Sequence, residues 1–310
     1  MAVGCGLNTP VLQRGGNGRM GVLLNYSCGA APCDPIDPSK PTIVITHGWN
    51  PLPKRIHTTF AQSGAQALKC RCGDSYNLLS WDWNGVRVHA TNGEPFRVGR
   101  QQGRMMAAAL ASRGVDPGRT QIIAHSLGTL VAAQAAQCLA HSRGQVLQLT
   151  LLDPPTQLHE EIFCKLRAAS HARIVENYWA PGPSGYGSEA DYCGVRNYRV
   201  RGIRPVAAVT GIVDLSMSNH VYVMRWYYDT MRVASMERGF QYSALRCACG
   251  AGGPCCERAP LAETDQEFDE LAESTDEPLR LQFPAAIAAR RSNDKPAVQV
   301  AITSDGSRNR

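Results

Sequence analysis

The chain alternates between short runs of apolar, often β-branched residues and longer stretches in which apolar positions recur with a helical spacing. The predicted strands are Thr42–Thr46, Asn77–Trp81, Gln121–Ala124, Gln148–Leu152 and Ala172–Tyr178. The predicted helices between them are Arg55–Leu68, Val98–Ala111 and Thr129–Ala140. Strands that are apolar on both faces are typical of a parallel sheet covered by helices. The pattern therefore predicts an α/β fold with a mostly parallel central sheet and helices on both faces.

Three segments depart from this alternation. Residues Asp82–Pro95 are expected to form a loop, and residues Ala180–Val200 begin with a stretch rich in Pro, Gly and Ser that is long enough to act as a flap. After Cys256 the chain becomes acidic and then rich in Ala and Arg, so we expect residues 257–310 to form a largely disordered tail. Residues 1–256 are left as the folded domain.

The composition excludes two classes of protein. No run of 18 or more apolar residues is present, so no membrane-spanning helix is predicted. The net charge is +6, with an acidic stretch between Glu257 and Glu277 that leaves the rest of the chain more basic. Such a charge either keeps the protein in solution or attracts anionic surfaces such as lipid headgroups. Short runs of Lys and Arg interleaved with aromatic residues are missing, so nucleic acid is not an expected partner.

Twelve cysteines give conflicting information about the compartment. This number favours disulfide bonds and a secreted or extracytoplasmic protein. Residues 1–20 nevertheless lack the apolar core of a signal peptide, so a cytoplasmic location stays open. The pairs Cys70/Cys72 and Cys255/Cys256 do not have the C-x₂-C spacing of common zinc sites, and nothing in the sequence requires a metal or another cofactor.

The segment Ala124-His125-Ser126-Leu127-Gly128 joins a predicted strand to a predicted helix. Small residues at positions 124 and 128 allow strand and helix to cross closely, and the strained turn between them projects the Ser126 hydroxyl away from the sheet. This is the arrangement of a serine nucleophile in α/β-hydrolases. The alternative is a serine that caps the helix.

A serine hydroxyl needs a base and a group that orients the base. In α/β-hydrolases these follow the nucleophile in the order acid, then histidine. Asp153 stands at the end of a predicted strand, before two prolines, and is the best candidate for the acid. His220 follows the flap and begins a new element, where a loop-borne base is expected, so it is preferred to the other downstream histidines, which are His141, His159 and His171.

A tetrahedral intermediate also needs hydrogen-bond donors for its oxyanion. The first predicted strand ends in His47-Gly48-Trp49, where the glycine allows a tight turn. We expect the backbone N–H groups of Trp49 and Leu127 to form the oxyanion hole.

These motifs together resemble the pancreatic-lipase family, which includes lipoprotein lipase and the phospholipases A1. The resemblance is carried by His47-Gly48-Trp49, Trp81-Asp82-Trp83, the segment around Ser126, Asp153-Pro154-Pro155, and Asn219-His220 with Tyr227-Tyr228, and it covers Pro41 to about Cys249. It implies an α/β-hydrolase fold and a lipid-ester hydrolase with the triad Ser126, Asp153 and His220. It also implies a lid between the acid and the histidine.

The sequence departs from that family in ways that leave the substrate open. Ala124 replaces the first glycine of the serine motif, and Cys193 is the only cysteine in the loop of the Asp153–His220 interval, so the disulfide that closes the lid in the family is not expected. The chain after His220 is too short for the family's lipid-binding C-terminal domain, so a colipase-type partner is not expected. A small-ester carboxylesterase, an acyltransferase with the same triad and a non-catalytic lipid-binding relative remain as alternatives.

Overall fold

The computed structural model describes residues 21–28, 35–49, 56–83, 94–181, 186–200, 215–232 and 239–246. The structural statements below concern these residues. The predicted tail at residues 257–310 lies outside them, as do residues 1–20.

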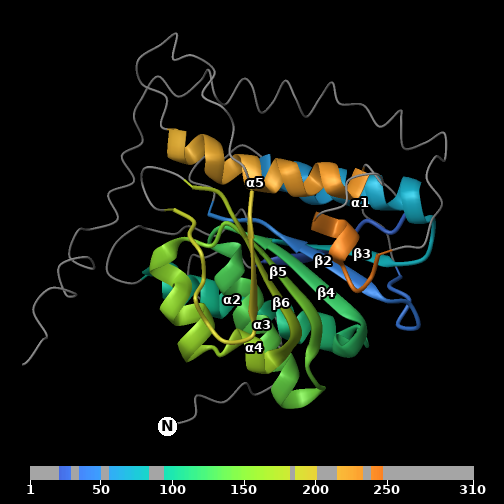
Figure 1. Cartoon of the computed structure of the whole chain (residues 1–310). Coiled ribbons are helices and arrows are strands. Elements are labelled where there is room, and N and C mark those ends of the chain that lie inside the picture. Colours follow the sequence, from blue (N-terminus) through green and yellow to red (C-terminus); the bar gives the residue numbers. More distant parts are fainter. Residues whose placement is uncertain are drawn as a thin grey trace, which may run out of the picture.

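The described residues contain a seven-stranded sheet (Figure 1). Its strands are β1 (Val22–Asn25), β2 (Thr42–Thr46), β3 (Asn77–Asp82), β4 (Thr120–His125), β5 (Val146–Leu152), β6 (Ala172–Trp179) and β7 (Val195–Arg199). They lie in the order β1-β3-β2-β4-β5-β6-β7. Only the pairing of β1 with β3 is antiparallel, and the other neighbouring pairs are parallel. This strand order is that of the α/β-hydrolase fold, and it confirms the prediction of a mostly parallel sheet.

Helices cover both faces of the sheet, as predicted (Figure 1). One face carries α2 (Glu94–Ser112), α3 (Gly128–Ser142) and the short α4 (Ala168–His171), and the other carries α1 (Ile56–Cys72) beside α5 (Leu215–Arg232). Short helical turns follow at Pro117–Arg119, Thr156–Leu158, Glu160–Lys165 and Gly239–Tyr242.

Alternation along the central strands divides the core into two layers. In β2, Val44 packs with α2 and α3, whereas Ile43 and Ile45 pack with α1 and α5. Successive side chains of a strand point to opposite faces, so a strand that is apolar throughout fills both layers. This is why the apolar runs in the sequence located β2, β4 and β5 to within two residues at each end.

One prediction about local structure was wrong, and one strand was not predicted. The stretch Ala180–Val200 was expected to be a loop, but it contains β7, whose backbone pairs with β6. This strand reads Val-Arg-Asn-Tyr-Arg and lies at the sheet edge, so it lacks the apolar run that marks a central strand. The antiparallel edge strand β1 was not predicted at all.

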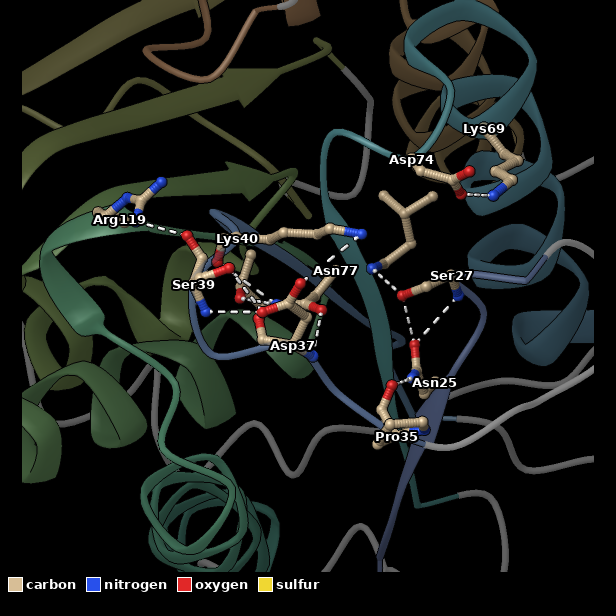
Figure 2. Close-up of polar contacts among 12 residues, drawn as sticks. Asn25, Ser27, Pro35, Asp37, Ser39, Lys40, Lys69, Asp74, Asn77 and Arg119 are labelled. Carbon is tan, nitrogen blue, oxygen red and sulfur yellow. Dashed lines mark hydrogen bonds and ion pairs between the residues drawn. The ribbon is translucent and has the colours of Figure 1, made fainter.

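Polar side chains fix the amino end of the sheet (Figure 2). Asn77, at the start of β3, accepts a hydrogen bond from the Asp37 N–H at 3.0 Å and donates to the Asp37 carbonyl at 2.7 Å. It also donates to the Thr42 hydroxyl at 3.2 Å, at the start of β2. Since Thr42 and Asn77 are register partners, one buried amide sets where both strands begin.

A buried polar cluster lies on the α5 face, in the middle of the sheet. Gln148 Nε2 donates to Glu176 Oε2 at 2.8 Å, and the Thr150 hydroxyl lies 3.4 Å from the same oxygen. Gln121 Nε2 reaches both the Thr150 hydroxyl and the Tyr227 hydroxyl. Burial raises the pKa of Glu176 to about 7, even though the hydrogen bonds from Gln148 and Thr150 oppose the shift.

Two further findings concern the cysteines and the length of the helices. Cys28 and Cys72 each take part in a disulfide bond, whereas Cys164 and Cys193 are exposed free thiols. No helix in the described ranges is long and apolar enough to cross a membrane.

Candidate active site

Ser126 occupies the sharp turn between β4 and α3. Its backbone φ is +53°, in the left-handed region, and its side chain is half-buried. The Ser126 N–H donates to the Leu152 carbonyl at the end of β5 at 3.0 Å, which ties the turn to the neighbouring strand. A non-glycine residue at this φ costs roughly 1–3 kcal/mol and persists only where the surrounding structure holds it. The strained serine turn predicted from the sequence is present.

Two glycines make the turn sterically possible. A Cβ added to Gly48 would lie 2.6 Å from Ser126 Cβ, and one added to Gly128 would collide with the carbonyl oxygen of His47. The end of β2, the serine turn and the first turn of α3 therefore pack backbone against backbone. Larger residues at 48 or 128 would force Ser126 out of position.

Asp153 occupies the equivalent turn one strand further along the sheet. It directly follows β5 and has a φ of +48°. Its carboxylate is buried, with 1% of the residue exposed, and Oδ1 accepts the Ala180 N–H at 3.0 Å. A Cβ added to Gly187 would collide with Asp153 Oδ1, so the strand-to-flap segment packs directly on the acid. The sequence placed Asp153 correctly at the end of a strand.

His220 pairs with this carboxylate. Its Nδ1 lies 2.6 Å from Asp153 Oδ2, and both side chains are buried. A hydrogen bond of this length between imidazole and carboxylate fixes the hydrogen on Nδ1 and leaves Nε2 as the proton acceptor. His220 was expected on a loop, but it lies in the second turn of α5, and that detail of the prediction was wrong. Asn219 Nδ2 donates to the Pro181 carbonyl at 2.7 Å, which connects this helix to the end of β6.

Two aromatic rings enclose the His220 imidazole. The ring of His125, the residue before the serine, lies 4.5 Å from it, and His125 Nε2 donates to the His220 carbonyl at 3.0 Å. The Tyr186 ring lies 5.0 Å away on the segment that follows the end of β6. These contacts place the imidazole beside the carboxyl end of β4, next to the serine turn.

Ser126 and His220 are neighbours through His125, but they are not joined by a hydrogen bond. Within the described residues, the Ser126 hydroxyl has no hydrogen-bond partner. In structures without substrate such contacts are often long and shorten when substrate binds. The structure thus brings together Asp153 and His220 directly and places Ser126 at the adjacent strand end.

The two expected oxyanion donors lie on either side of the serine. Leu127 is the N-cap of α3, and Trp49 follows Gly48 at the end of β2. In the part of the chain that the structure describes, neither backbone N–H is taken by an acceptor. N–H groups at a helix N-terminus have no partner within the helix, so Leu127 can bind a developing negative charge.

The other downstream histidines are occupied elsewhere. His159 is buried and its Nε2 donates to the Pro154 carbonyl at 3.2 Å, while burial lowers its pKa despite the nearby Asp153 carboxylate. His141 and His171 lie at the opposite end of the sheet, where α3 ends and β6 begins. His220 alone among the four contacts Asp153 through a side-chain hydrogen bond.

Sequence reasoning missed several residues that build this site. His47 and His125 are both buried next to the serine turn, and Ala180 and Gly187 surround the acid. The signal available in the sequence was the position of the two histidines directly before Gly48 and Ser126. Ala180 reaches Asp153 directly after β6, and Gly187 is held by a bridge to Pro155, so these contacts could not be anticipated from a segment interpreted as a loop.

Nothing in the described ranges suggests a metal centre. No group of three or more His, Cys, Asp and Glu side chains there is arranged to hold a metal ion.

The chain matches no protein-family model and no curated protein. Its fold is similar to solved structures, among them a hyperthermophilic esterase from the archaeon Pyrobaculum calidifontis, with 14% identity, 69% of this chain and 84% of that chain covered, and a TM-score of 0.37. Another is the thioesterase RedJ from the prodiginine pathway of Streptomyces coelicolor, with 14% identity, 63% and 88% coverage and a TM-score of 0.36. Esterase 2 of Thermogutta terrifontis has 14% identity, 66% and 86% coverage and a TM-score of 0.37. These similarities are distant.

Proposed function

We propose that the chain is a serine hydrolase of carboxylic esters, with Ser126 as nucleophile, His220 as general base and Asp153 as the residue that orients the base. The observation that carries this proposal is the buried Asp153–His220 pair, 2.6 Å apart, beside a serine held at positive φ on the adjacent strand end. Ser126 follows β4, Asp153 follows β5 and His220 lies in α5, so the three residues come from three different elements. No structural requirement of the sheet explains why a strained serine and this pair should meet at one edge.

The reaction follows from this geometry. Ser126 Oγ rotates toward His220 Nε2, gives up its proton and attacks the acyl carbonyl carbon. The carbonyl oxygen becomes negative and is bound by the N–H groups of Leu127 and Trp49. The C–O bond of the ester then breaks, and the imidazolium returns the proton to the leaving alcohol. A water molecule, activated by the same imidazole, hydrolyses the acyl-enzyme.

We propose an ester with a lipid acyl chain as the substrate, because the sequence resembles the pancreatic-lipase family around each of these residues. A short soluble ester is favoured by a different observation. Part of the expected flap is the strand β7, and Gly187 and Tyr186 of the same interval pack on the acid and the base. A segment fixed in this way leaves less chain to open over a large substrate.

Hydrolysis of p-nitrophenyl esters tests the proposal. Wild-type protein is expected to hydrolyse p-nitrophenyl butyrate, and Ser126→Ala is expected to lower kcat by at least about 1,000-fold without unfolding, as monitored by circular dichroism. A Ser126→Ala variant with full activity would contradict the proposed mechanism.

A chain-length series separates the two substrate classes. A lipid-ester hydrolase is expected to show higher kcat/KM on p-nitrophenyl palmitate and on phospholipid vesicles than on the butyrate ester, with a rise in rate once an interface forms. A soluble-ester hydrolase is expected to prefer the butyrate ester and to show no such rise.

A further inference from the structure

His47, the residue directly after β2, uses both ring nitrogens in a buried environment. Its Nδ1 lies 2.7 Å from the carbonyl oxygen of Gly48, and its Nε2 lies 3.0 Å from the backbone N of Trp83. Only 3% of the residue is exposed. Gly48 and Trp49 were assigned roles from the sequence, whereas the imidazole of His47 has none so far.

The partners determine which nitrogen carries the hydrogen. A backbone N–H can only donate, so Trp83 requires Nε2 to be the acceptor. A carbonyl oxygen can only accept, so Gly48 requires Nδ1 to carry the hydrogen. The hydrogen on Nδ1 is therefore directed at the Gly48 carbonyl.

The ring is held in this orientation by Trp83. The indole of Trp83 stacks on the imidazole with ring centroids 5.0 Å apart and planes 10° apart. Its indole N–H also donates to the His47 carbonyl at 3.1 Å. The carboxylate of Asp82 lies 3.3 Å from His47 Nε2, on the same side as the Trp83 N–H. Rotation of the imidazole would break the stacking and the hydrogen bond from the Trp83 backbone at once.

The Gly48 carbonyl belongs to the same peptide group as the Trp49 N–H. Because a trans peptide is planar, its C=O and N–H point in opposite directions. A carbonyl held toward the His47 ring therefore turns the Trp49 N–H away from that ring. The Cα of Gly48 packs against Ser126, since an added Cβ would lie 2.6 Å from Ser126 Cβ and 3.1 Å from Oγ. The peptide whose direction His47 sets is thus adjacent to the nucleophile.

We propose that His47 is a positioning residue for the oxyanion hole, which acts by fixing the direction of the Trp49 N–H through the Gly48 carbonyl. This inference rests on the proposed ester-hydrolase function and adds a third histidine, next to His125 and His220, to the groups around the site. His47 itself does not touch the substrate. Its effect is expected on kcat, because oxyanion donors act on the transition state more than on the bound substrate.

Two substitutions each keep the hydrogen bond of only one ring nitrogen of His47. In His47→Asn the side-chain amide nitrogen takes the place of Nδ1 and can still donate to the Gly48 carbonyl, but the Trp83 N–H loses its acceptor. In His47→Gln the amide oxygen reaches the place of Nε2 and can accept from Trp83, but the donor to Gly48 is lost. His47→Asn therefore keeps the hydrogen bond to the Gly48 carbonyl, and His47→Gln keeps the hydrogen bond from the Trp83 N–H.

We expect His47→Gln to lose more activity and His47→Asn to lose more stability. His47→Gln is expected to lower kcat for p-nitrophenyl butyrate by about 100-fold, with KM changed by less than about three-fold, which is the range for loss of one oxyanion donor. His47→Asn is expected to retain kcat within about 10-fold while its melting temperature falls below that of His47→Gln. A residue that is only structural would give kcat values that follow the melting temperatures.

The outcomes distinguish this inference from the function on which it rests. If Ser126→Ala is inactive but both His47 variants keep wild-type kcat, or lose kcat in proportion to stability, the positioning role is wrong and the hydrolase assignment stands. If Ser126→Ala keeps wild-type activity, the proposed function is wrong and the role of His47 falls with it. Reduced kcat in His47→Gln together with rescue in His47→Asn supports both.

Discussion

Asp153 and Glu176 are both buried carboxylates on neighbouring strands, but their surroundings are opposite. Asp153 follows β5 at the carboxyl edge of the sheet, where both of its oxygens accept hydrogen bonds, from His220 Nδ1 and from the Ala180 N–H. Glu176 lies within β6, opposite Thr150. At about 3.3 Å per residue this position is roughly 10 Å back along the strands from Asp153.

The two carboxylates also differ in how many of their oxygens accept hydrogen bonds. Glu176 Oε2 is bonded by neutral side chains, whereas Oε1 is buried without a hydrogen-bond partner among the described residues. Asp153 has the His220 imidazole as its partner, a group that can accept a proton and become positively charged. Burial alone therefore does not identify a catalytic acid in this fold. The distinguishing features are the titratable partner and the position at the strand end, beside a serine turn.

The first way to test this comparison is to remove the charge of Asp153. Asp153→Asn is expected to lower kcat on p-nitrophenyl butyrate by about 10,000-fold with little change in KM, because an amide no longer holds the hydrogen of His220 on Nδ1. Steady-state kinetics measure the loss, and circular dichroism checks the fold. A loss of less than 10-fold would contradict the assigned role of Asp153.

The matched change, Glu176→Gln, is expected to leave kcat within about two-fold and to alter the pH dependence of stability. The pKa of Glu176 is about 7 in the folded chain and near 4.5 in the unfolded chain. Between pH 4.5 and pH 7 the folded state therefore holds a proton that the unfolded state has released. Wild-type stability should therefore fall as pH rises from about 4.5 to 7, by roughly 3 kcal/mol in all.

The amide cannot titrate, so the variant should lack this fall. Urea denaturation of both proteins at pH 4, 6 and 8 measures the difference, and Glu176→Gln should gain stability relative to wild type as the pH rises. Parallel stability curves would show that Glu176 titrates normally in the folded chain.

A smaller effect is expected from Gly187→Ala, which disturbs the surroundings of Asp153 without changing its charge. The added methyl group would collide with Asp153 Oδ1 and shift the carboxylate relative to His220. A displacement of this size is expected to lower kcat by 10- to 100-fold. Kinetics of the variant beside Gly118→Ala, in which the added Cβ would lie near Asp116 instead, provide the comparison. Equal kcat in the two variants would argue against close packing on Asp153.

The smallest effect is expected at Thr150. Its hydroxyl hydrogen bond lowers the pKa of Glu176, so Thr150→Val should raise that pKa further and move the pH-dependent fall in stability to higher pH. The substitution also removes the acceptor of Gln121 Nε2 and Gln148 Nε2, and each buried hydrogen bond that is lost should cost about 1 kcal/mol. The same urea series at pH 4, 6 and 8 detects both changes. If the pH dependence of stability is unchanged, the Thr150 hydroxyl does not influence the pKa of Glu176.

The sequence was sufficient to predict the placement of residues that is decided by chain order and strand ends. Ser126 and Asp153 directly follow apolar strands, and parallel strands bring their carboxyl ends to one edge, so their proximity could be predicted. His220 was selected by elimination and order, and the structure pairs it with Asp153. Its place on a helix was missed because the residue was interpreted as a base on a loop, although Asp214, a residue type typical of helix starts, directly precedes Leu215.

The sequence was insufficient where a role depends on contacts between distant segments. Glu176 occupies a strand position that reads as one polar residue in Arg-Ile-Val-Glu-Asn-Tyr, and its neighbours come from β4 and β5. The direction of the His47 ring depends on Trp83, which is 36 residues away. The edge strand β7 has the polar composition of a loop and is recognised only by its pairing with β6.

The most direct test of the account is covalent labelling of the nucleophile. Incubation of the wild-type protein with a fluorophosphonate, followed by proteolysis and mass spectrometry, should give one adduct, on the peptide that contains Ser126, because this serine occupies the strained turn after β4, next to the strand that ends at Asp153. Labelling should be lost in Ser126→Ala and strongly slowed in Asp153→Asn. An adduct on another residue, or labelling that persists in Ser126→Ala, would contradict the proposed catalytic site.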